Sequence, residues 1–393
     1  MPATPTAPHV GINALLLSAA ASYRSAGVSG YIRRLLAYLP EVAPDLRFTA
    51  FVPDGDLRLS TPLPLHRVRG WNVEQPTRRI LWEQWALPQH TRRLGLDLLH
   101  GPVSITPVLA GCPTVVTIHD LTFLAYPEAF PAAKRLYLRS QVGRSARAAR
   151  RVIASSHATA QDVVRRLRVP PERVTVVHLG VDPEFTPAPA DQVEAFRRRR
   201  GLPDRFVLHV GTLEPRKNLV RLVEAFARLR QRCPDLADVR LVLAGGKGWG
   251  YGPVFAAVER LGLSRDVLFP GYVPDEELAW WYRAATVFAY PSLMEGFGLP
   301  VLEALACGGV VVTSALSSMP EVAGDAALLV DPTDVDALAD ALLQSLVNDE
   351  LRAALRSRAL VQAQRFPWRR AIAQTAAVYR QVLGLPPAEG EDA

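Results

Sequence analysis

Residues 287–313 read VFAYPSLMEGFGLPVLEALACGGVVVT. This segment begins and ends with short apolar runs, 287–290 and 310–313, which have the β-branched and aromatic composition of buried strands. Between them, Pro300 suits the first turn of a helix, and the pair Gly308-Gly309 suits its end. The segment is therefore predicted to form a strand, a helix and a second strand, which is the unit from which parallel sheets are built.

The same alternation runs along the chain and predicts an α/β fold with two Rossmann-like domains. Short β-branched runs and longer amphipathic runs, among them predicted helices at 76–94 and 131–150, alternate up to residue 178 and again from residue 206. Four prolines at 183–203 indicate a linker between the two series. We expect the two parallel sheets to face each other across a cleft, because ligands of such sheets bind at the carboxyl ends of the strands. The predicted boundaries are domains at 1–185 and 205–365, a linker at 186–204, and a C-terminal helix at 366–393 that packs back toward the N-terminal domain.

The composition indicates a globular protein of a reducing compartment. The chain has 393 residues, of which 49% are hydrophobic and 21% charged, a size and balance typical of two folded domains. Its three cysteines, Cys112, Cys233 and Cys307, form no CxxC pair, which excludes a disulfide framework and a zinc site of the usual spacing. No apolar run approaches the ~20 residues that span a bilayer. We therefore expect a cytoplasmic protein, at most peripheral at the inner face of the membrane.

The positive charge is concentrated in the front half of the chain. Residues 1–200 contain 26 Lys and Arg against 15 Asp and Glu, a net charge of +11, whereas residues 201–393 have a net charge of −4. An excess of positive charge in this half of the chain favours an anionic partner. The basic residues lack the aromatic interleaving of nucleic-acid modules, so no nucleic-acid partner is expected. The basic stretch 134–151 instead suggests contact with an anionic membrane or with a lipid-linked phosphate.

Three segments at predicted strand ends contain candidate binding residues. Gly30 lies in GVSG, just before a predicted helix whose free amides could bind an anion. His119 closes an apolar strand; the alternative is a structural histidine bonded to nearby backbone. Arg216 and Lys217 precede a helix start, where the macrodipole disfavours cations, so a bound diphosphate would reverse that penalty. The alternative there is a solvated loop.

Two glutamates flank the turn of the opening segment. Glu303 lies in an apolar helix, where an unpaired carboxylate would cost several kcal/mol, so it needs a hydrogen-bond donor. The vicinal hydroxyls of a ribose would supply two, and an internal arginine is the alternative. Glu295, at the turn, could accept hydroxyls from a second polyol. The pair predicts groups that bind sugars at the two ends of a pyrophosphate.

These residues together resemble the large family 4 of retaining glycosyltransferases, which have the GT-B fold. The resemblance rests on the E-x7-E pattern of Glu295 and Glu303, on Arg216-Lys217 after a Gly-Thr turn, and on His119 after a strand. It covers nearly the whole chain. The stretches 27–31, 211–218 and 318–325 look most like bacterial cell-surface polysaccharide mannosyltransferases.

The resemblance implies a role for each site residue. His119, Arg216, Lys217 and Glu295 would be catalytic, and Glu303 would bind the nucleotide ribose. The N-terminal domain would bind the acceptor and the C-terminal domain the nucleotide sugar. The implied donor-binding set is Gly30, Gly211, Thr212, Arg216, Lys217, Gly246, Lys247, Val273, Glu295, Gly296, Phe297, Gly298, Leu299 and Glu303.

The implied reaction transfers a hexosyl unit with retention to a glycan or lipid-linked acceptor in polysaccharide or lipopolysaccharide synthesis. The donor expected from the subgroup is GDP-mannose. The family's proposed mechanism is a front-face attack, in which the departing phosphate takes the acceptor's proton while Arg216 and Lys217 stabilise its charge. No cofactor or metal is expected, because the DxD motifs at 54–56 and 334–336 look like a turn and a helix start.

Other readings remain open at this point. The donor could be a UDP-, ADP- or dTDP-sugar. The chain could be a nonhydrolysing nucleotide-sugar epimerase of the same fold, or a non-catalytic nucleotide-sugar-binding scaffold. An NAD-dependent oxidoreductase is less favoured, because the glycine-rich stretch 244–250 matches GxGxxG in no register.

Overall fold

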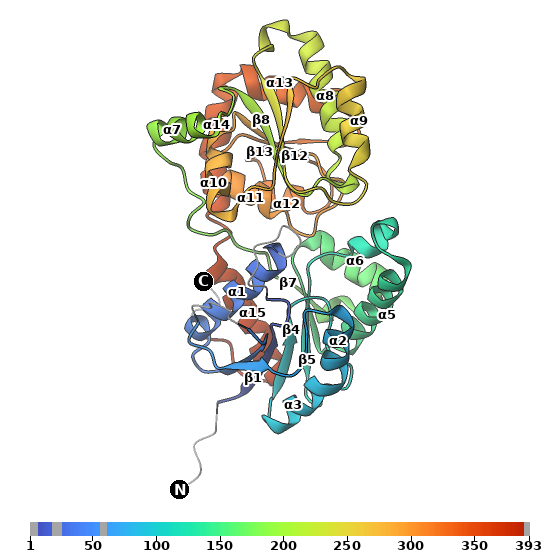
Figure 1. The fold of residues 1–393 in the computed structure, drawn as a ribbon. Coiled ribbons are helices and arrows are strands. Elements are labelled where there is room, and N and C mark those ends of the chain that lie inside the picture. The colour runs from blue at the N-terminus through green and yellow to red at the C-terminus, as the bar shows by residue number, and fades with distance from the viewer. Residues whose placement is uncertain (1–6, 18–25, 56–60, 389–393) are drawn as a thin grey trace. The chain divides into compact units, whose positions relative to one another are not determined.

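The computed structural model describes residues 7–17, 26–55 and 61–388. It divides into two compact units. Unit 1 comprises Met1–Gly180 together with Trp368–Ala393, and unit 2 comprises Val181–Pro367. Each is built on one parallel sheet with helices packed on it, which confirms the predicted α/β class (Figure 1). None of the helices described is both long and apolar enough to cross a membrane.

Unit 1 contains a seven-stranded sheet of order β3-β2-β1-β4-β5-β6-β7. Its central strands are buried along their whole length, as expected for parallel strands covered on both faces. The strands are β1 (His9–Asn13), β2 (Arg47–Pro53), β3 (Leu65–Val68), β4 (Leu98–Gly101), β5 (Thr114–Ile118), β6 (Arg151–Ala154) and β7 (Val174–Val176). The helices are α1 (Ala26–Val42), α2 (Pro76–Leu81), the π-helix η1 (Trp82–Ala86), α3 (Leu87–Arg93), α4 (Thr122–Ala125), α5 (Ala132–Ala148), α6 (His157–Leu167) and α15 (Trp368–Leu383).

The last helix, α15, completes the core of unit 1 by packing on α1. Tyr379 is fully buried, and its hydroxyl lies 2.6 Å from Nδ1 of His100, at the end of β4. Arg380 is 4% exposed and donates from Nε to Asp45 at 3.1 Å. These contacts connect the end of the chain to segments more than 270 residues earlier.

Unit 2 contains a six-stranded parallel sheet of order β10-β9-β8-β11-β12-β13. The strands are β8 (Phe206–Val210), β9 (Arg240–Ala244), β10 (Val267–Gly271), β11 (Val287–Tyr290), β12 (Val311–Ser314) and β13 (Ala327–Val330). The helices are α7 (Ala190–Arg200), α8 (Leu219–Arg232), α9 (Gly252–Arg260), α10 (Asp275–Ala284), α11 (Leu299–Ala306), α12 (Met319–Ala323), α13 (Val335–Val347) and α14 (Asp349–Ala363). Residues 287–313 form β11, α11 and most of β12, as predicted.

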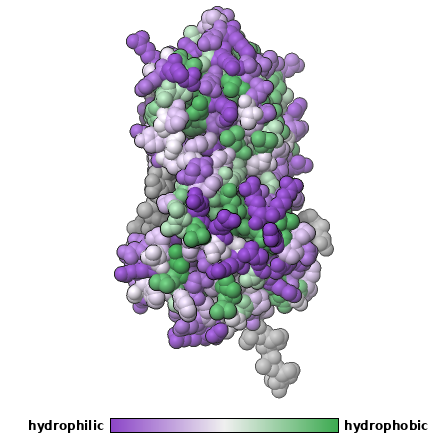
Figure 2. Space-filling view, turned by 90° about the vertical axis from the view of Figure 1, so that its right-hand side faces the viewer, coloured by the Kyte–Doolittle hydropathy of each residue, from purple (hydrophilic) through white to green (hydrophobic). Residues whose placement is uncertain are grey.

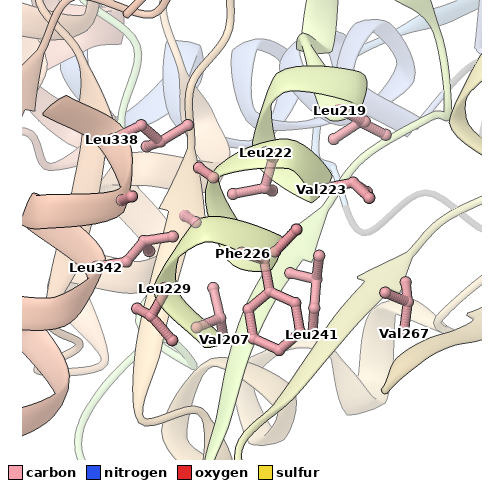
Figure 3. Packing of buried hydrophobic residues seen from close by; sticks show 14 of the residues in the cluster. Val207, Leu219, Leu222, Val223, Phe226, Leu229, Leu241, Val267, Leu338 and Leu342 are labelled. Atoms are coloured by element: carbon pink, nitrogen blue, oxygen red, sulfur yellow. The ribbon is translucent and has the colours of Figure 1, made fainter. Parts of the chain in front are cut away.

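One face of this sheet packs on α8 and α13 (Figure 3). The apolar side chains of α8 recur at helical spacing, with Leu222, Phe226 and Leu229 pointing to the same core. Leu338 and Leu342 of α13 meet them. This core fixes the positions of β8 and β11, from whose carboxyl ends the candidate site is built.

One local prediction in unit 1 was confirmed with a change of helical pitch, and one was wrong. The helix expected at 76–94 runs without a break over 76–93, but its middle part, η1, is π-helical, exposes Trp85 and buries Glu83. The segment 27–30 was expected to precede a helix, but α1 already begins at Ala26. Gly30 lies one turn inside α1, so its amide is not among the unpaired amides of that helix's first turn.

Candidate active site

The charged candidates Arg216, Lys217 and Glu295 of unit 2 lie in loops that follow the carboxyl ends of β8 and β11. Gly211 follows β8, and its amide donates to the carbonyl of Ala244, the last residue of β9, at 2.9 Å. Arg216 and Lys217 lie in the short 3-10 helix η4 (Pro215–Lys217), and Glu295 lies between β11 and α11. Since β8 and β11 are parallel neighbours, the loops that follow them meet at the same edge of the sheet.

The carboxylate of Glu295 is the point at which these loops join. Its Oε1 accepts hydrogen bonds from Nζ of Lys217 at 2.5 Å and from the hydroxyl of Tyr290 at 3.1 Å. Its Oε2 accepts from Nη1 of Arg216 at 2.6 Å. Nε of Arg216 in turn pairs with Glu214 at 2.5 Å. The two cations predicted to bind a diphosphate are therefore paired with carboxylates of the protein.

This cluster is buried and contains two positive and two negative side chains. Lys217 is 5% exposed and Glu295 9%. Burial alone would raise the pKa of Glu295, but the charges of Arg216 and Lys217 outweigh it and lower this pKa to about 2. Burial and the charge of Arg216 lower the pKa of Lys217, whereas Glu295 opposes that shift. The carboxylate is thus ionised at neutral pH. Removing either the positive or the negative side chains of the cluster would leave a buried charge without compensation.

Backbone contacts hold the loop of Glu295 in place. The side chains of Ser317 and Ser318 both donate to the Glu295 carbonyl, at 2.8 and 3.1 Å, and the Glu295 amide donates to Ser317 at 3.2 Å. Asn218, which follows η4 with a φ of 61°, donates from Nδ2 to the carbonyls of Pro291 and Pro332. The amide of residue 293 donates to the Arg216 carbonyl at 2.8 Å. Contacts within the protein therefore hold both loops in place.

A buried histidine lies beneath the cluster. His209 has no exposed surface, and its ring stacks on Tyr290 with centroids 5.3 Å apart. Burial and the nearby charge of Lys217 lower the pKa of His209 to about 3, so the ring is neutral. Its Nδ1 lies 3.1 Å from the Ala289 carbonyl and donates to it. A β-carbon on Gly211 would lie 3.3 Å from Nε2, so only a small residue leaves room beside the ring.

Glu303 has a different partner from those considered in the sequence. It lies half-buried on α11, and its Oε2 accepts a hydrogen bond from the hydroxyl of Tyr282, in α10, at 2.8 Å. Burial and the charge of Glu303 together raise the pKa of Tyr282 well above its usual range. Tyr282 therefore stays protonated and orients this carboxylate.

The remaining donor-binding candidates of unit 2 lie on tightly approaching loops. Gly245 has a φ of +151°, and a β-carbon there would lie 1.9 Å from the Gly211 carbonyl oxygen, so no other residue fits. Next to it, the amide of Leu213 donates to Gly246 at 2.9 Å. Nζ of Lys247 lies 5.3 Å from the ring centroids of two aromatic residues, Tyr251 and Phe255. Thr212 follows Gly211, and Val273 follows β10 and is 7% exposed.

The turn at 296–299 also depends on a glycine. Gly298 caps α11 with a φ of 111°, and a β-carbon there would lie 2.3 Å from Cε of Met319. Phe297 is 3% exposed and packs edge-on against Phe366, whereas Leu299 is the first residue of α11. Gly296 is buried beside it. The turn thus presents the backbone of 296–299 at the N-terminus of α11, next to Glu295.

In unit 1, His119 directly follows β5, as predicted. Its Nε2 lies 3.0 Å from the Pro102 carbonyl, to which it donates, so Nδ1 is the acceptor nitrogen. Burial lowers the pKa of His119, which keeps the ring neutral. Tyr31 packs edge-on against it at 4.7 Å, and Ser155 donates to its carbonyl at 2.7 Å. The alternative, that this histidine bonds to nearby backbone, is therefore confirmed, and its role in catalysis stays a prediction.

The predicted site residues thus fall into two groups, one in each unit. Gly30 and His119 belong to unit 1, and the other candidates belong to unit 2, where Arg216, Lys217 and Glu295 are in direct contact. Asp334 of the second DxD motif caps α13, and Asp336 pairs with Arg232 at 2.5 Å, so both have structural partners.

Sequence reasoning missed four side chains: Tyr282, Tyr290, His209 and Ser317. Each is distant in sequence from the group that it contacts or carries no motif of its own. The tyrosine at the end of β11 could have been noticed, because it is the one polar side chain in the apolar strand that leads into the Glu295 loop.

Each of the two units matches a protein-family model. Residues 25–185 match the model described as Glycosyltransferase Family 4, and residues 192–361 match that of the group 1 glycosyl transferases. The O-antigen chain mannosyltransferase B of Escherichia coli is 36% identical over 271 residues, which are 68% of this chain and 70% of that protein. A D-inositol 3-phosphate glycosyltransferase of Kribbella flavida is 37% identical over 251 residues, 62% of this chain and 59% of that one. The serotype-specific mannosyltransferase WbdA of E. coli is 31% identical over 265 residues, 65% of this chain but only 32% of WbdA.

Solved structures show the same fold at low identity. Sucrose-phosphate synthase from Thermosynechococcus elongatus has a TM-score of 0.75 at 23% identity, covering 96% of this chain and 99% of that one. WaaG, a glycosyltransferase involved in lipopolysaccharide biosynthesis, has a TM-score of 0.70 at 19% identity, covering 94% and 99%. The family resemblance inferred from Glu295, Glu303, Arg216 and Lys217 is confirmed: this chain belongs to the family 4 glycosyltransferases and has the GT-B fold.

Proposed function

We propose that this chain is a retaining hexosyltransferase that moves mannose from GDP-mannose to a glycan or lipid-linked acceptor in cell-surface polysaccharide synthesis. The choice of mannose is supported by the similarity to the O-antigen chain mannosyltransferase of E. coli over about two thirds of both chains. The observation that carries the reaction type is the buried pairing of Glu295 with Arg216 and Lys217.

In this proposal, the diphosphate of the donor replaces the Glu295 carboxylate as the partner of the two cations. Buried cations need an anion, and a diphosphate brings more charge than one carboxylate. The exchange releases the carboxylate while leaving its backbone fixed by Ser317 and Ser318. Glu295 is then positioned to accept hydroxyls of the donor sugar, beside the amides of 296–299.

Arg216 and Lys217 then stabilise the leaving group. Negative charge develops on the departing phosphate oxygen, and preorganised cations in a water-poor site are the usual means of stabilising it. A double displacement would require a carboxylate nucleophile at the anomeric carbon, whereas this proposal assigns the released Glu295 carboxylate to the hydroxyls of the donor sugar. A front-face attack, with the phosphate taking the acceptor's proton, fits this set of side chains better.

Two further groups have roles in this proposal. In unit 2, Glu303 binds the ribose, with its orientation set by Tyr282. In unit 1, neutral His119 can accept a substrate hydroxyl at Nδ1, because its Nε2–H is already donated to Pro102. No step needs a metal, since Arg216 and Lys217 supply the positive charge, so chelators should leave transfer unchanged.

The decisive experiment is calorimetric binding of GDP, UDP, ADP, dTDP and NAD, followed by transfer assays with the sugar of the base that binds. Tighter binding of GDP and release of GDP from GDP-mannose in the presence of a mannan or lipid-linked acceptor would support the proposal. Preference for another diphosphate would replace the donor but keep the reaction. Binding of NAD alone, or a donor converted to a free epimer without an acceptor, would overturn it.

A further inference from the structure

Unit 1 exposes large apolar side chains on the helical segment formed by α2 and η1. Leu81 is 51% exposed and Trp85 72%. Leu81 and Trp85 lie three and seven residues after Arg78, which is also exposed, and this spacing places all three side chains on one stripe of the helix. Exposed apolar side chains that form a contiguous patch mark interaction sites, whereas single ones do not, so the stripe matters more than either residue alone.

A second exposed apolar side chain lies on α5 among basic residues. Leu136 is 70% exposed, and Arg135 and Arg139 beside it are also exposed. The helix Ala132–Ala148 contains five basic residues and no acidic one. No ion pair is formed by Arg78, Arg135 or Arg139 within the part of the chain that the structure describes.

These two segments are neighbours. Tyr137, on α5, is close enough to η1 and α2 to feel their charges. Burial and the charge of Glu83 raise the pKa of its hydroxyl, whereas the charge of Arg79 opposes that shift. Figure 1 draws α2 beside α5, on the right of unit 1. Figure 2 views that side and shows hydrophobic surface interspersed with hydrophilic surface there. We call the set Arg78, Leu81, Trp85, Arg135, Leu136 and Arg139 the aromatic–basic face.

We infer that the aromatic–basic face binds an anionic lipid bilayer. Tryptophan and leucine enter the boundary between headgroups and acyl chains, and arginines that form no ion pair within the protein attract anionic headgroups. A second copy of the chain fits poorly, because a symmetric contact would place arginine against arginine. A nucleic acid would satisfy the arginines but not the two leucines. The inference extends the proposed function by placing the enzyme where a lipid-linked acceptor resides.

The test is flotation of the full chain with vesicles of phosphatidylcholine alone or with added phosphatidylglycerol, without donor or acceptor. We expect flotation only with phosphatidylglycerol, weakened by salt. Trp85→Ser and Leu136→Ser should each lower the partition coefficient on the order of tenfold, and Arg135→Gln and Arg139→Gln about fivefold each. The matched controls are Val361→Ser, at a position 64% exposed in unit 2, and Arg356→Gln, in the same helix.

Each outcome decides the inference independently of the proposed reaction, because no nucleotide sugar is present. Equal flotation of the face variants and the controls would overturn it. So would flotation of the parent to the same extent with neutral vesicles. A dimer that Trp85→Ser dissociates, or binding of RNA in place of vesicles, would also overturn it by naming another occupant. Circular dichroism and melting of each variant exclude misfolding, since all six residues of the face are exposed.

Discussion

Replacing Glu295 by glutamine should tighten the binding of a nucleoside diphosphate while it slows transfer. The Glu295 carboxylate accepts hydrogen bonds from the two cations that the diphosphate is proposed to bind. The diphosphate must therefore compete with an internal anion. Glutamine removes the negative charge but keeps the shape of the side chain, so the competition weakens.

The magnitude follows from the pKa of Glu295. Its fall from 4.5 to about 2 means that the ionised form is stabilised by about 3 kcal/mol, since one pKa unit is about 1.4 kcal/mol. The side chain is buried, so solvent screening removes little of this. The competing interaction that glutamine abolishes is of this order, but the amide oxygen still accepts weaker hydrogen bonds. We expect GDP to bind roughly tenfold to a hundredfold more tightly.

The assay is calorimetric titration of GDP into the parent, Glu295→Gln and the control Glu259→Gln, an exposed carboxylate on α9. Without ligand, the Glu295→Gln variant should melt at a lower temperature than the parent, because its buried cations lose their compensating charge. Added GDP should raise the melting temperature of the variant by more than that of the parent. Weaker GDP binding by a folded Glu295→Gln variant would refute the reasoning. It would mean that the carboxylate assists the diphosphate and does not compete with it.

Four other expectations follow from the same contacts. Arg216→Ala should lower turnover tenfold or more, because each ~1.4 kcal/mol of lost stabilisation is a factor of ten, and an unchanged rate would remove it from the mechanism. Glu303→Ala should weaken donor and free GDP alike, and Tyr282→Phe should do so by a smaller factor; calorimetry that finds only sugar recognition impaired would contradict the ribose role. The pKa of Glu295 is lower in the folded state, so its contribution to stability is present above pH 4.5 and is lost as pH falls toward about 2; urea midpoints should show this loss in the parent and not in Glu295→Gln. Tyr379→Phe should cost about 1 kcal/mol of stability by removing the bond to His100, and an unchanged urea midpoint would show that this bond contributes nothing.

The sequence was enough to predict the fold because its evidence is local. The alternation around residues 287–313 is set by the burial of parallel strands and is legible without any distant contact. The π-helical turn at Trp82–Ala86 could not be predicted from the sequence. The pattern of 76–94 is that of an ordinary amphipathic helix, and only packing reveals the extra residue in the turn.

The candidate site was predicted residue by residue but not contact by contact. Motif spacing indicated Arg216, Lys217 and Glu295 separately. It gave no sign that they pair, because the pairing joins loops 79 residues apart along the chain. The same holds for Glu303, whose partner Tyr282 lies in the preceding helix α10 and carries no motif.

The return of α15 to unit 1 has a consequence for how the protein is made and cut. Tyr379 and Arg380 are synthesised after the whole of unit 2, so unit 1 begins to emerge from the ribosome before unit 2 and is completed after it. Unit 2 is continuous and can close its core while unit 1 still waits for its final helix. A deletion that looks like a modest trimming of the C-terminus would therefore open the core at the opposite end of the sequence, and a fragment ending at Gly180 would lack part of its own hydrophobic interior.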